Sequence, residues 1–209
     1  METYTVTVDR HKTIRWHQNG KIHRVGCPAV EYADGTKCWY QNNKIHRTDG
    51  PAMECADGDK FWYQNGKRHR IDGPASEQTN GTKRWHQNDK CHRIDGPAVE
   101  YADGRKFWYQ NDKLHRIDGP ASVYPDGDKH WYLNGKCHRI SGPAIERTNG
   151  SKFWYQNNKL HRVDGPAVEC ADGGKSWYLN GKKLTEAKFN KKSKVVMIDG
   201  KKYTLTEIT

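Results

Sequence analysis

Seven His-Arg pairs recur along the chain at intervals of 23 residues, from His23-Arg24 to His161-Arg162. Imidazole is the commonest protein ligand for zinc and copper, and guanidinium binds phosphate or carboxylate through paired hydrogen bonds. The pairs therefore suggest either a metal site or an anion site. Which chemistry is open to them depends on the elements that hold them.

Tryptophan keeps the same interval. The eight tryptophans of the chain are Trp16, Trp39, Trp62, Trp85, Trp108, Trp131, Trp154 and Trp177. Each repeat follows the consensus W-Y-Q-N-G-K-x-H-R-x-D-G-P-A-x-E-x-x-D-G-x-K-x, with seven Pro-Ala pairs in the same phase. A repeat array of this kind offers an extended surface rather than a single pocket.

The composition limits how such an array can pack. Hydrophobic residues make up 33% of the 209 residues and the mean hydropathy is −1.12, values that approach those of disordered chains. Only four Phe and three Met are left for a central core. We therefore expect stacked repeats that each bury a modest stripe against their neighbours.

Asp-Gly or Asn-Gly at the end of each repeat predicts a two-residue type I′ hairpin. With Asp57-Gly58 as the turn, Met53 lies opposite Trp62, and the same count places Val30 opposite Trp39. Aromatic and β-branched side chains are favourable cross-strand partners. This agreement between copies supports the register.

Asn-Gly after the tryptophan predicts a second tight turn, which would place Trp62 opposite His69. A strand that ran straight on from His69 would displace the next repeat by about 23 Å, so it must break, and Asp72-Gly73-Pro74 is the expected place. The N-G-K-x-H-R-x-D segment is then a structured loop of about eight residues, which can itself fold over as a small hairpin.

The predicted fold is all-β: an elongated, solenoid-like antiparallel meander of 23-residue two-stranded repeats with a short C-terminal helix and hairpin as a cap. We expect a capping strand in residues 1–10, the array in residues 11–184 and the C-terminal cap in residues 185–209. Thr185 is the expected N-cap of the helix, and residues 195–203 are the expected hairpin.

The period, the aromatic strand, the N-G-K turn followed by histidine and the closing D-G resemble MORN repeats. They are more similar to the MORN-like arrays of W-Y-x-N-G-K-x-H-R-x-D-G-P-A repeats in bacteria, phages and large DNA viruses. The resemblance covers about residues 11–184. It implies an elongated sheet that serves as a protein-binding scaffold, linked in some members to membrane lipids and labelled antitoxin-like in some bacterial ones. The chain has His-Arg and Gly-Pro-Ala where MORN repeats have His-Gly-x-Gly.

The remaining sequence signals indicate a protein of a reducing compartment. METYTVTVDR lacks the pattern of a signal peptide and no stretch is long enough for a membrane span, so we expect a soluble, cytoplasmic protein, in the host cytoplasm if it is viral. Cys91 and Cys137 take the place of Leu114 in the repeat, and Cys55 and Cys170 that of a tyrosine. They substitute for other residues, so no disulfide or zinc framework is expected.

The spacing of the histidines disfavours a metal site. Equivalent histidines in neighbouring repeats would lie roughly 9–10 Å apart, too far for two of them to bind one ion at about 2 Å. We expect no metal and no cofactor, with each histidine packed on an aromatic ring or bonded to the loop.

The arginines allow two interpretations. Asp lies two residues after arginine in five copies, which favours a local ion pair that holds the loop. The alternative is a row of guanidinium groups that captures a small anion, with candidates Arg24, Arg116, Arg139 and Arg162. Arg24 and Arg139 are informative because Gly26 and Ser141 replace the aspartate.

The residues beside each tryptophan predict an aromatic strip on the opposite face, with a charged rim, that could bind a protein partner. This strip comprises Tyr40, Phe61, Tyr63, Phe107, Tyr109, Tyr132, Phe153 and Tyr155. Alternatively, the strip covers itself by curling or by forming a homodimer.

No catalytic constellation is evident, because every candidate acid or base is copied many times. The leading hypothesis is a non-enzymatic scaffold that binds a protein through the aromatic strip. The second is a trap for a small anionic ligand, a nucleotide or phosphate-rich metabolite, in the His-Arg loops. The third is binding of nucleic acid or an anionic membrane by the basic tail, because residues 182–209 carry eight Lys and Arg against three acidic residues.

Overall fold

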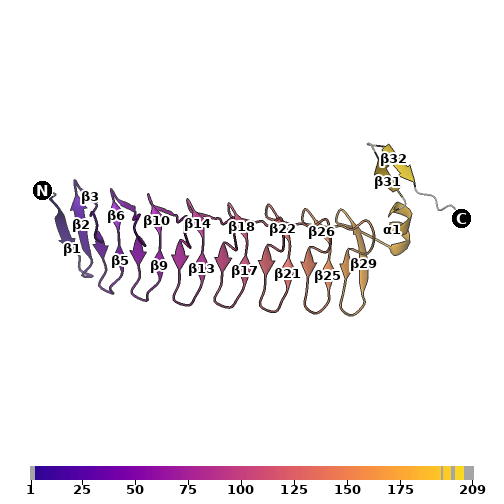
Figure 1. Ribbon diagram of the computed structural model, residues 1–209, viewed down its shortest axis with the longest axis horizontal. Coiled ribbons are helices and arrows are strands. Elements are labelled where there is room, and N and C mark those ends of the chain that lie inside the picture. The colour runs from indigo at the N-terminus through magenta and orange to yellow at the C-terminus, as the bar shows by residue number, and fades with distance from the viewer. Residues whose placement is uncertain (1–2, 194, 199–200, 205–209) are drawn as a thin grey trace. The chain divides into compact units, whose positions relative to one another are not determined.

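The computed structural model of the protein describes residues 3–193, 195–198 and 201–204. Its strands are of two kinds, those of an antiparallel main sheet and those of small two-stranded side hairpins. The chain divides into two compact parts, Met1–Lys113 and Leu114–Thr209. The predicted all-β class, built from repeated antiparallel strand pairs, is confirmed within each part (Figure 1).

The N-terminal part contains ten main-sheet strands among its described residues. They are β1 (Thr5–Val8), β2 (Ile14–Gln18), β4 (Val30–Glu31), β5 (Lys37–Cys38), β8 (Met53–Glu54), β9 (Lys60–Phe61), β12 (Ser76–Glu77), β13 (Lys83–Arg84), β16 (Val99–Glu100) and β17 (Lys106–Phe107). The side-hairpin strands are β3 (Lys21–Ile22), which pairs with the end of β2, β6 (Tyr40–Gln41), β7 (Lys44–Ile45), β10 (Tyr63–Gln64), β11 (Lys67–Arg68), β14 (His86–Gln87), β15 (Lys90–Cys91) and β18 (Tyr109–Gln110). The boundary residues Lys113–Leu114 form β19.

The C-terminal part follows the same plan. Its main-sheet strands are β20 (Ser122–Val123), β21 (Lys129–His130), β24 (Ile145–Glu146), β25 (Lys152–Phe153), β28 (Val168–Glu169) and β29 (Lys175–Leu179), with β30 (Lys182–Leu184) paired to β29. Its side-hairpin strands are β22 (Tyr132–Leu133), β23 (Lys136–Cys137), β26 (Tyr155–Gln156) and β27 (Lys159–Leu160).

The cap predicted at the C-terminus is a helix followed by a hairpin. Helix α1 (Glu186–Ser193) begins after Thr185, whose hydroxyl accepts a hydrogen bond from the Lys188 N–H at 3.3 Å, as an N-cap does. Strands β31 (Val195–Ile198) and β32 (Lys201–Thr204) then pair antiparallel, and the turn between them lies outside the described residues. At the other end of the chain, β1 pairs with β2, as expected of a capping strand.

The predicted register of the main sheet is wrong by one residue. Met53 lies opposite Phe61 rather than Trp62, and Val30 lies opposite Cys38 rather than Trp39. The turn has three residues. A two-residue type I′ turn would need a positive φ at both central residues, and here only the glycine has one, as at Gly58 (φ 91°). Asp57 is not left-handed; its carboxylate instead accepts the Asp59 N–H at 3.0 Å. This is a type I turn closed by a glycine, with an Asx bond that the Asp-Gly pattern alone does not distinguish from type I′.

The Asn-Gly segment folds as the second hairpin that the sequence allowed. Tyr63 pairs with Arg68, and the His69 N–H donates to the Trp62 carbonyl at 3.1 Å. In the repeats between β2 and β29 the main strand ends before the tryptophan, so the chain turns out of the main sheet into the side hairpin. Figure 1 shows the side hairpins of each part along one edge of its sheet and the Asp-Gly loops along the other.

The alanine of each Pro-Ala pair is the centre of packing. All seven are completely buried: Ala29, Ala52, Ala75, Ala98, Ala121, Ala144 and Ala167. The Ala52 carbonyl accepts the Trp39 N–H at 2.8 Å, and the Ala29 N–H donates to Cys38 at 2.9 Å. A side chain larger than a methyl group would overfill this position.

A second set of hydrogen bonds links consecutive side hairpins. The Asn43 N–H donates to the Ile22 carbonyl at 2.9 Å, and its side-chain oxygen accepts the Ile22 N–H at 2.7 Å. Asp89 makes the same pair of bonds with Arg68. In the copy with Gly66 only the backbone bond to the Ile45 carbonyl remains.

The substitution Gly66→Asn should therefore stabilise the protein. Asparagine tolerates the left-handed backbone (φ 83° at Gly66) and adds an acceptor for the Ile45 N–H, a gain of about 0.5–1 kcal/mol. Urea denaturation measures the change. Gly66→Ala is the matched control, because it adds a Cβ without an acceptor and should destabilise. Equal midpoints for the two variants would contradict the assignment of this bond.

Candidate binding surface

The arginine of six of the seven His-Arg pairs stacks on the tryptophan of its own repeat. The guanidinium carbon lies 3.9–4.1 Å from the indole centre in the pairs Arg24–Trp16, Arg47–Trp39, Arg70–Trp62, Arg93–Trp85, Arg139–Trp131 and Arg162–Trp154. Cation–π attraction is strongest for indole and grows as the pair loses water. The stack therefore fixes the loop after the side hairpin against the sheet.

The same guanidinium groups hold the loop by hydrogen bonds. Arg70 donates to the Pro74 carbonyl at 3.2 Å, to the Asp72 carboxylate at 3.2 Å and to the Glu77 carboxylate at 3.0 Å. The expected local ion pair between arginine and the aspartate two residues later is confirmed at Arg47, Arg70, Arg93, Arg116 and Arg162. Sequence reasoning did not foresee the proline carbonyl or the glutamate seven residues later.

The four arginines considered for anion binding have protein partners as well. Arg24 lies 3.7 Å from Glu31 and Arg139 lies 2.7 Å from Glu146, although both lack the aspartate. Arg116 pairs with Asp118, and Arg162 with both Asp164 and Glu169. An anion would have to compete with these carboxylates for guanidiniums whose side chains are only 20–27% exposed.

The histidines bind the following repeat by one ring nitrogen. In all seven copies the N–H of the next asparagine donates to Nδ1 at 3.0–3.3 Å, as Asn111 does to His92. When Nδ1 is the acceptor, the proton of the neutral ring is on Nε2. No group of three metal-ligating side chains suited to an ion is present among the described residues.

The aromatic strip is half-buried. Partial exposure is found at all eight of its side chains: Tyr40, Phe61, Tyr63, Phe107, Tyr109, Tyr132, Phe153 and Tyr155. Burial raises the pKa of Tyr40 and of Tyr155. Arg68 covers part of the strip, since its guanidinium carbon lies 5.2 Å from the Phe61 ring and its Nε donates to the Tyr63 hydroxyl at 3.1 Å.

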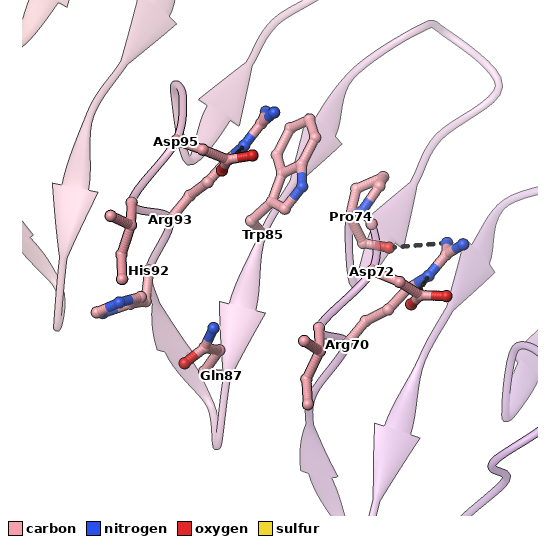
Figure 2. A pocket seen from close by; sticks show the side chains of 11 residues that line it. Arg70, Asp72, Pro74, Trp85, Gln87, His92, Arg93 and Asp95 are labelled. Carbon is pink, nitrogen blue, oxygen red and sulfur yellow. Dashed lines mark hydrogen bonds and ion pairs between the residues drawn. The ribbon is translucent and has the colours of Figure 1, made fainter.

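A recess opens between each of several pairs of successive R-x-D-G-P loops. The recess between the loops at Arg70 and Arg93 has a volume of about 480 Å³. Figure 2 shows Trp85 and Gln87 between the two loops, with His92 beside them. Equivalent recesses lie over Trp62 in the same part and over Trp154 in the C-terminal part.

Exposed aliphatic side chains stand at the position after the arginine in these loops, some of them at the border of a recess, and sequence reasoning missed them. They are Val25 (57% exposed), Ile71 (79%), Ile94 (81%), Ile117 (85%), Ile140 (81%) and Val163 (62%). The signal was present, because the residue after the arginine is β-branched in every copy, including Thr48. We call the recesses and these side chains the loop face.

The last recess of the array is bordered on one side by helix α1. It lies over Trp177 and is lined by Val163 on one side and by Glu186 and Phe189 of helix α1 on the other. Phe189 is only 3% exposed. Here an apolar side chain of the cap occupies the place where the next loop would stand.

The chain matches no model of a known protein family and no curated protein. Among its described residues, no helix is long and apolar enough to cross a membrane.

The cysteines are all free. Burial raises the pKa of Cys91 and of Cys137 to about 12, and that of Cys38 to about 11. These three are therefore thiols rather than thiolates at neutral pH, and the thiol is the less nucleophilic form.

Arg93→Lys should destabilise the protein by about 2 kcal/mol. A lysine loses the planar stack on Trp85 and the hydrogen bonds that Nη1 donates to the Pro97 carbonyl and the Glu100 carboxylate. Asp95→Ser copies the residue that the chain has at Ser141, and should destabilise the protein much less than Arg93→Lys because the carboxylate is exposed to solvent. Urea denaturation compares the two. A larger loss for Asp95→Ser would show that the exposed ion pair, rather than the stack, holds the loop.

Acid should weaken the fold partly through His86 and His130. Burial lowers the pKa of both from the ordinary value of 6.5. The unfolded chain then takes up protons at a higher pH than the folded one, so this stability is complete above pH 6.5 and is lost as the pH falls toward the lowered values. The double variant His86→Tyr, His130→Phe carries the residues of the neighbouring copies Tyr109 and Phe107.

This variant should lose less stability than the parent between about pH 7.5 and pH 5, as thermal unfolding at each pH would measure. The seven loop histidines are unchanged in it and serve as the internal reference. An identical loss in parent and variant would show that His86 and His130 do not contribute.

Proposed function

We propose that the protein is a non-enzymatic, MORN-like repeat scaffold that binds a protein partner through its loop face. The exposed aliphatic side chains carry this proposal. Five of them are more than 60% exposed, and they stand on loops fixed by the arginine–tryptophan stack. A set of exposed apolar side chains with a polar rim is typical of a protein-binding site.

The rigidity of the loops supports binding. Each loop is held by a stacked arginine, a bond to a proline carbonyl and an ion pair, so little conformational entropy remains to be lost when a partner docks. The cap provides a precedent within the chain, because Phe189 of α1 is buried beside Trp177. The cap thus places a buried apolar side chain beside the last tryptophan, which supports the proposal that the loop face can bind apolar groups.

The aromatic strip is a second surface for the same function. Its tyrosines are half-buried and keep part of their rings available, with Arg68 and Arg147 at its rim. We rank it below the loop face because its side chains are individually less exposed than the aliphatic side chains of the loops. The anion-trap alternative ranks lower still, since the guanidiniums it needs have carboxylate partners.

A capture experiment tests the proposal. The immobilised protein is exposed to a cell lysate beside two variants, Ile71→Glu with Ile94→Glu and Ile140→Glu, and Tyr109→Ala with Tyr132→Ala. The three isoleucines are 79–81% exposed, so the glutamates should leave the fold intact while placing charge on the loop face. A protein retained by the parent should be lost by the isoleucine variant and kept by the tyrosine variant. The opposite pattern would assign binding to the aromatic strip, and retention by both would refute both surfaces.

A further inference from the structure

The spacing of the recesses restricts what can bind along them. Within the N-terminal part, two strands of the main sheet and two strands of side hairpin are added with each repeat, and backbone bonds such as Arg70 N–H to His86 carbonyl join the hairpins. Neighbouring strands lie about 4.7–4.9 Å apart, and two strands are added per repeat, so consecutive recesses are about 9.4–9.8 Å apart. One turn of a polyproline II helix advances three residues, or about 9.3 Å.

This coincidence distinguishes between extended ligands. A polyproline II helix has three residues per turn, so every third side chain returns to the same face and can meet successive recesses. In a β-strand, three residues cover nearly the same length, but alternate side chains point to opposite faces, so only every second recess would be met. A regular ligand that fills neighbouring recesses is therefore of the polyproline II kind.

We propose that the loop face binds a proline-rich segment in the polyproline II conformation that carries basic residues. The inference rests on the proposed function and specifies its partner. The recesses over Trp62 and Trp85, which are consecutive, form the part of the loop face on which the argument is made.

The polar groups of the recess match such a ligand. Trp85 Nε1, the Gln87 amide and His92 Nε2 make no hydrogen bond to any residue that the structure describes. With Nδ1 of His92 engaged by Asn111, all three groups can donate. A polyproline II backbone has no internal hydrogen bonds and its prolines lack N–H groups, so it presents unbonded carbonyls to donors.

The apolar groups match as well. Ile71 and Ile94 stand on the two loops that border the recess, and the Trp85 indole lies between these loops (Figure 2). Aromatic-lined grooves bind pyrrolidine rings at low entropic cost, because the ligand is already extended. Prolines would pack between the isoleucines and against the part of the indole that Arg93 leaves open.

The charge at the rim favours basic residues in the ligand. Asp49, Asp72 and Asp95 are 77–85% exposed, whereas Arg47, Arg70 and Arg93 are 21–23% exposed. Each of these arginines is also paired with a glutamate of its own repeat, so each loop has two carboxylates for one guanidinium. Although the whole chain has a net charge of +11, the most exposed charged side chains of these loops are carboxylates.

Synthetic peptides test the proposal by isothermal titration calorimetry on the full chain. The peptide Ac-(Pro-Pro-Arg)4-NH2 should bind. Ac-(Gly-Ser-Arg)4-NH2 has the same charge and no preference for polyproline II, and its affinity should be lower by at least roughly tenfold. Ac-(Pro-Pro-Glu)4-NH2 should not bind. Equal affinity for the first two peptides would show attraction by charge alone and overturn the proposal.

The chain offers matched variants that should keep the fold. Ile71→Thr with Ile94→Thr copies Thr48, and Asp72→Ser with Asp95→Ser copies Ser141. Each pair should weaken binding of the Pro-Pro-Arg peptide about fivefold to tenfold, whereas Tyr63→Phe, outside the loop face, should not. Unchanged affinity in the loop-face variants would place the peptide elsewhere and refute the proposal.

The outcome is separable from that of the proposed function. If no peptide binds the parent, the polyproline II ligand is refuted. A captured protein that is lost on glutamate substitution of the isoleucines would still establish the loop face as a docking surface for another kind of partner. If the Pro-Pro-Arg peptide binds and no protein is captured, the ligand class is supported, and the lysate contained no protein with such a segment.

Discussion

The stack of one arginine on one tryptophan, found in six of the repeats, is the contact on which the other features depend. The tryptophan N–H is bonded to the alanine carbonyl of the following strand, as Trp85 is to Ala98. The arginine backbone N–H is bonded to the next side hairpin, as Arg93 is to Tyr109. Because the two side chains then meet at about 4 Å, main sheet, side hairpin and loop are fixed together within a repeat that has no central core.

Several side chains serve both the fold and the surface. His92 uses Nδ1 to bind the following repeat and leaves Nε2 at the recess. Asp95 accepts the Arg93 Nε–H, which helps to lower the pKa of its carboxyl, and still exposes 82% of its side chain. A surface made of groups that are also structural is pre-organised, because holding the fold and orienting the binding groups are the same interactions.

The sequence predicted most of the architecture because a period of 23 residues lets each position be compared with its copies. Strand pairs, the side hairpin, the N-cap at Thr185 and the arginine–aspartate pairs follow from local residue chemistry. The register did not, since a two-residue and a three-residue turn share the Asp-Gly pattern. The two turns differ in whether the residue before glycine has a left-handed backbone. At Asp57 the backbone is not left-handed, and its carboxylate accepts the Asp59 N–H, which stabilises the three-residue turn.

The loop face was harder to predict than the fold. An aliphatic residue between a charged pair, such as Ile71 between Arg70 and Asp72, is expected to point inward in a strand and carries no clear meaning in a loop. Its exposure follows from the arginine, which turns in to stack on tryptophan and so turns the next side chain out. That is a consequence of a tertiary contact, and no local pattern contains it.

The interlocking bonds between side hairpins have a consequence for how such a chain can change in length. Because Asn43 reaches back to Ile22 in the same way that Asp89 reaches back to Arg68, any repeat presents its successor with the same set of donors and acceptors. Insertion or deletion of one whole 23-residue segment would restore the same hydrogen bonds between consecutive side hairpins. Insertion or deletion of any other number of residues would not. The number of repeats can therefore change only in whole 23-residue steps if these bonds are to be kept.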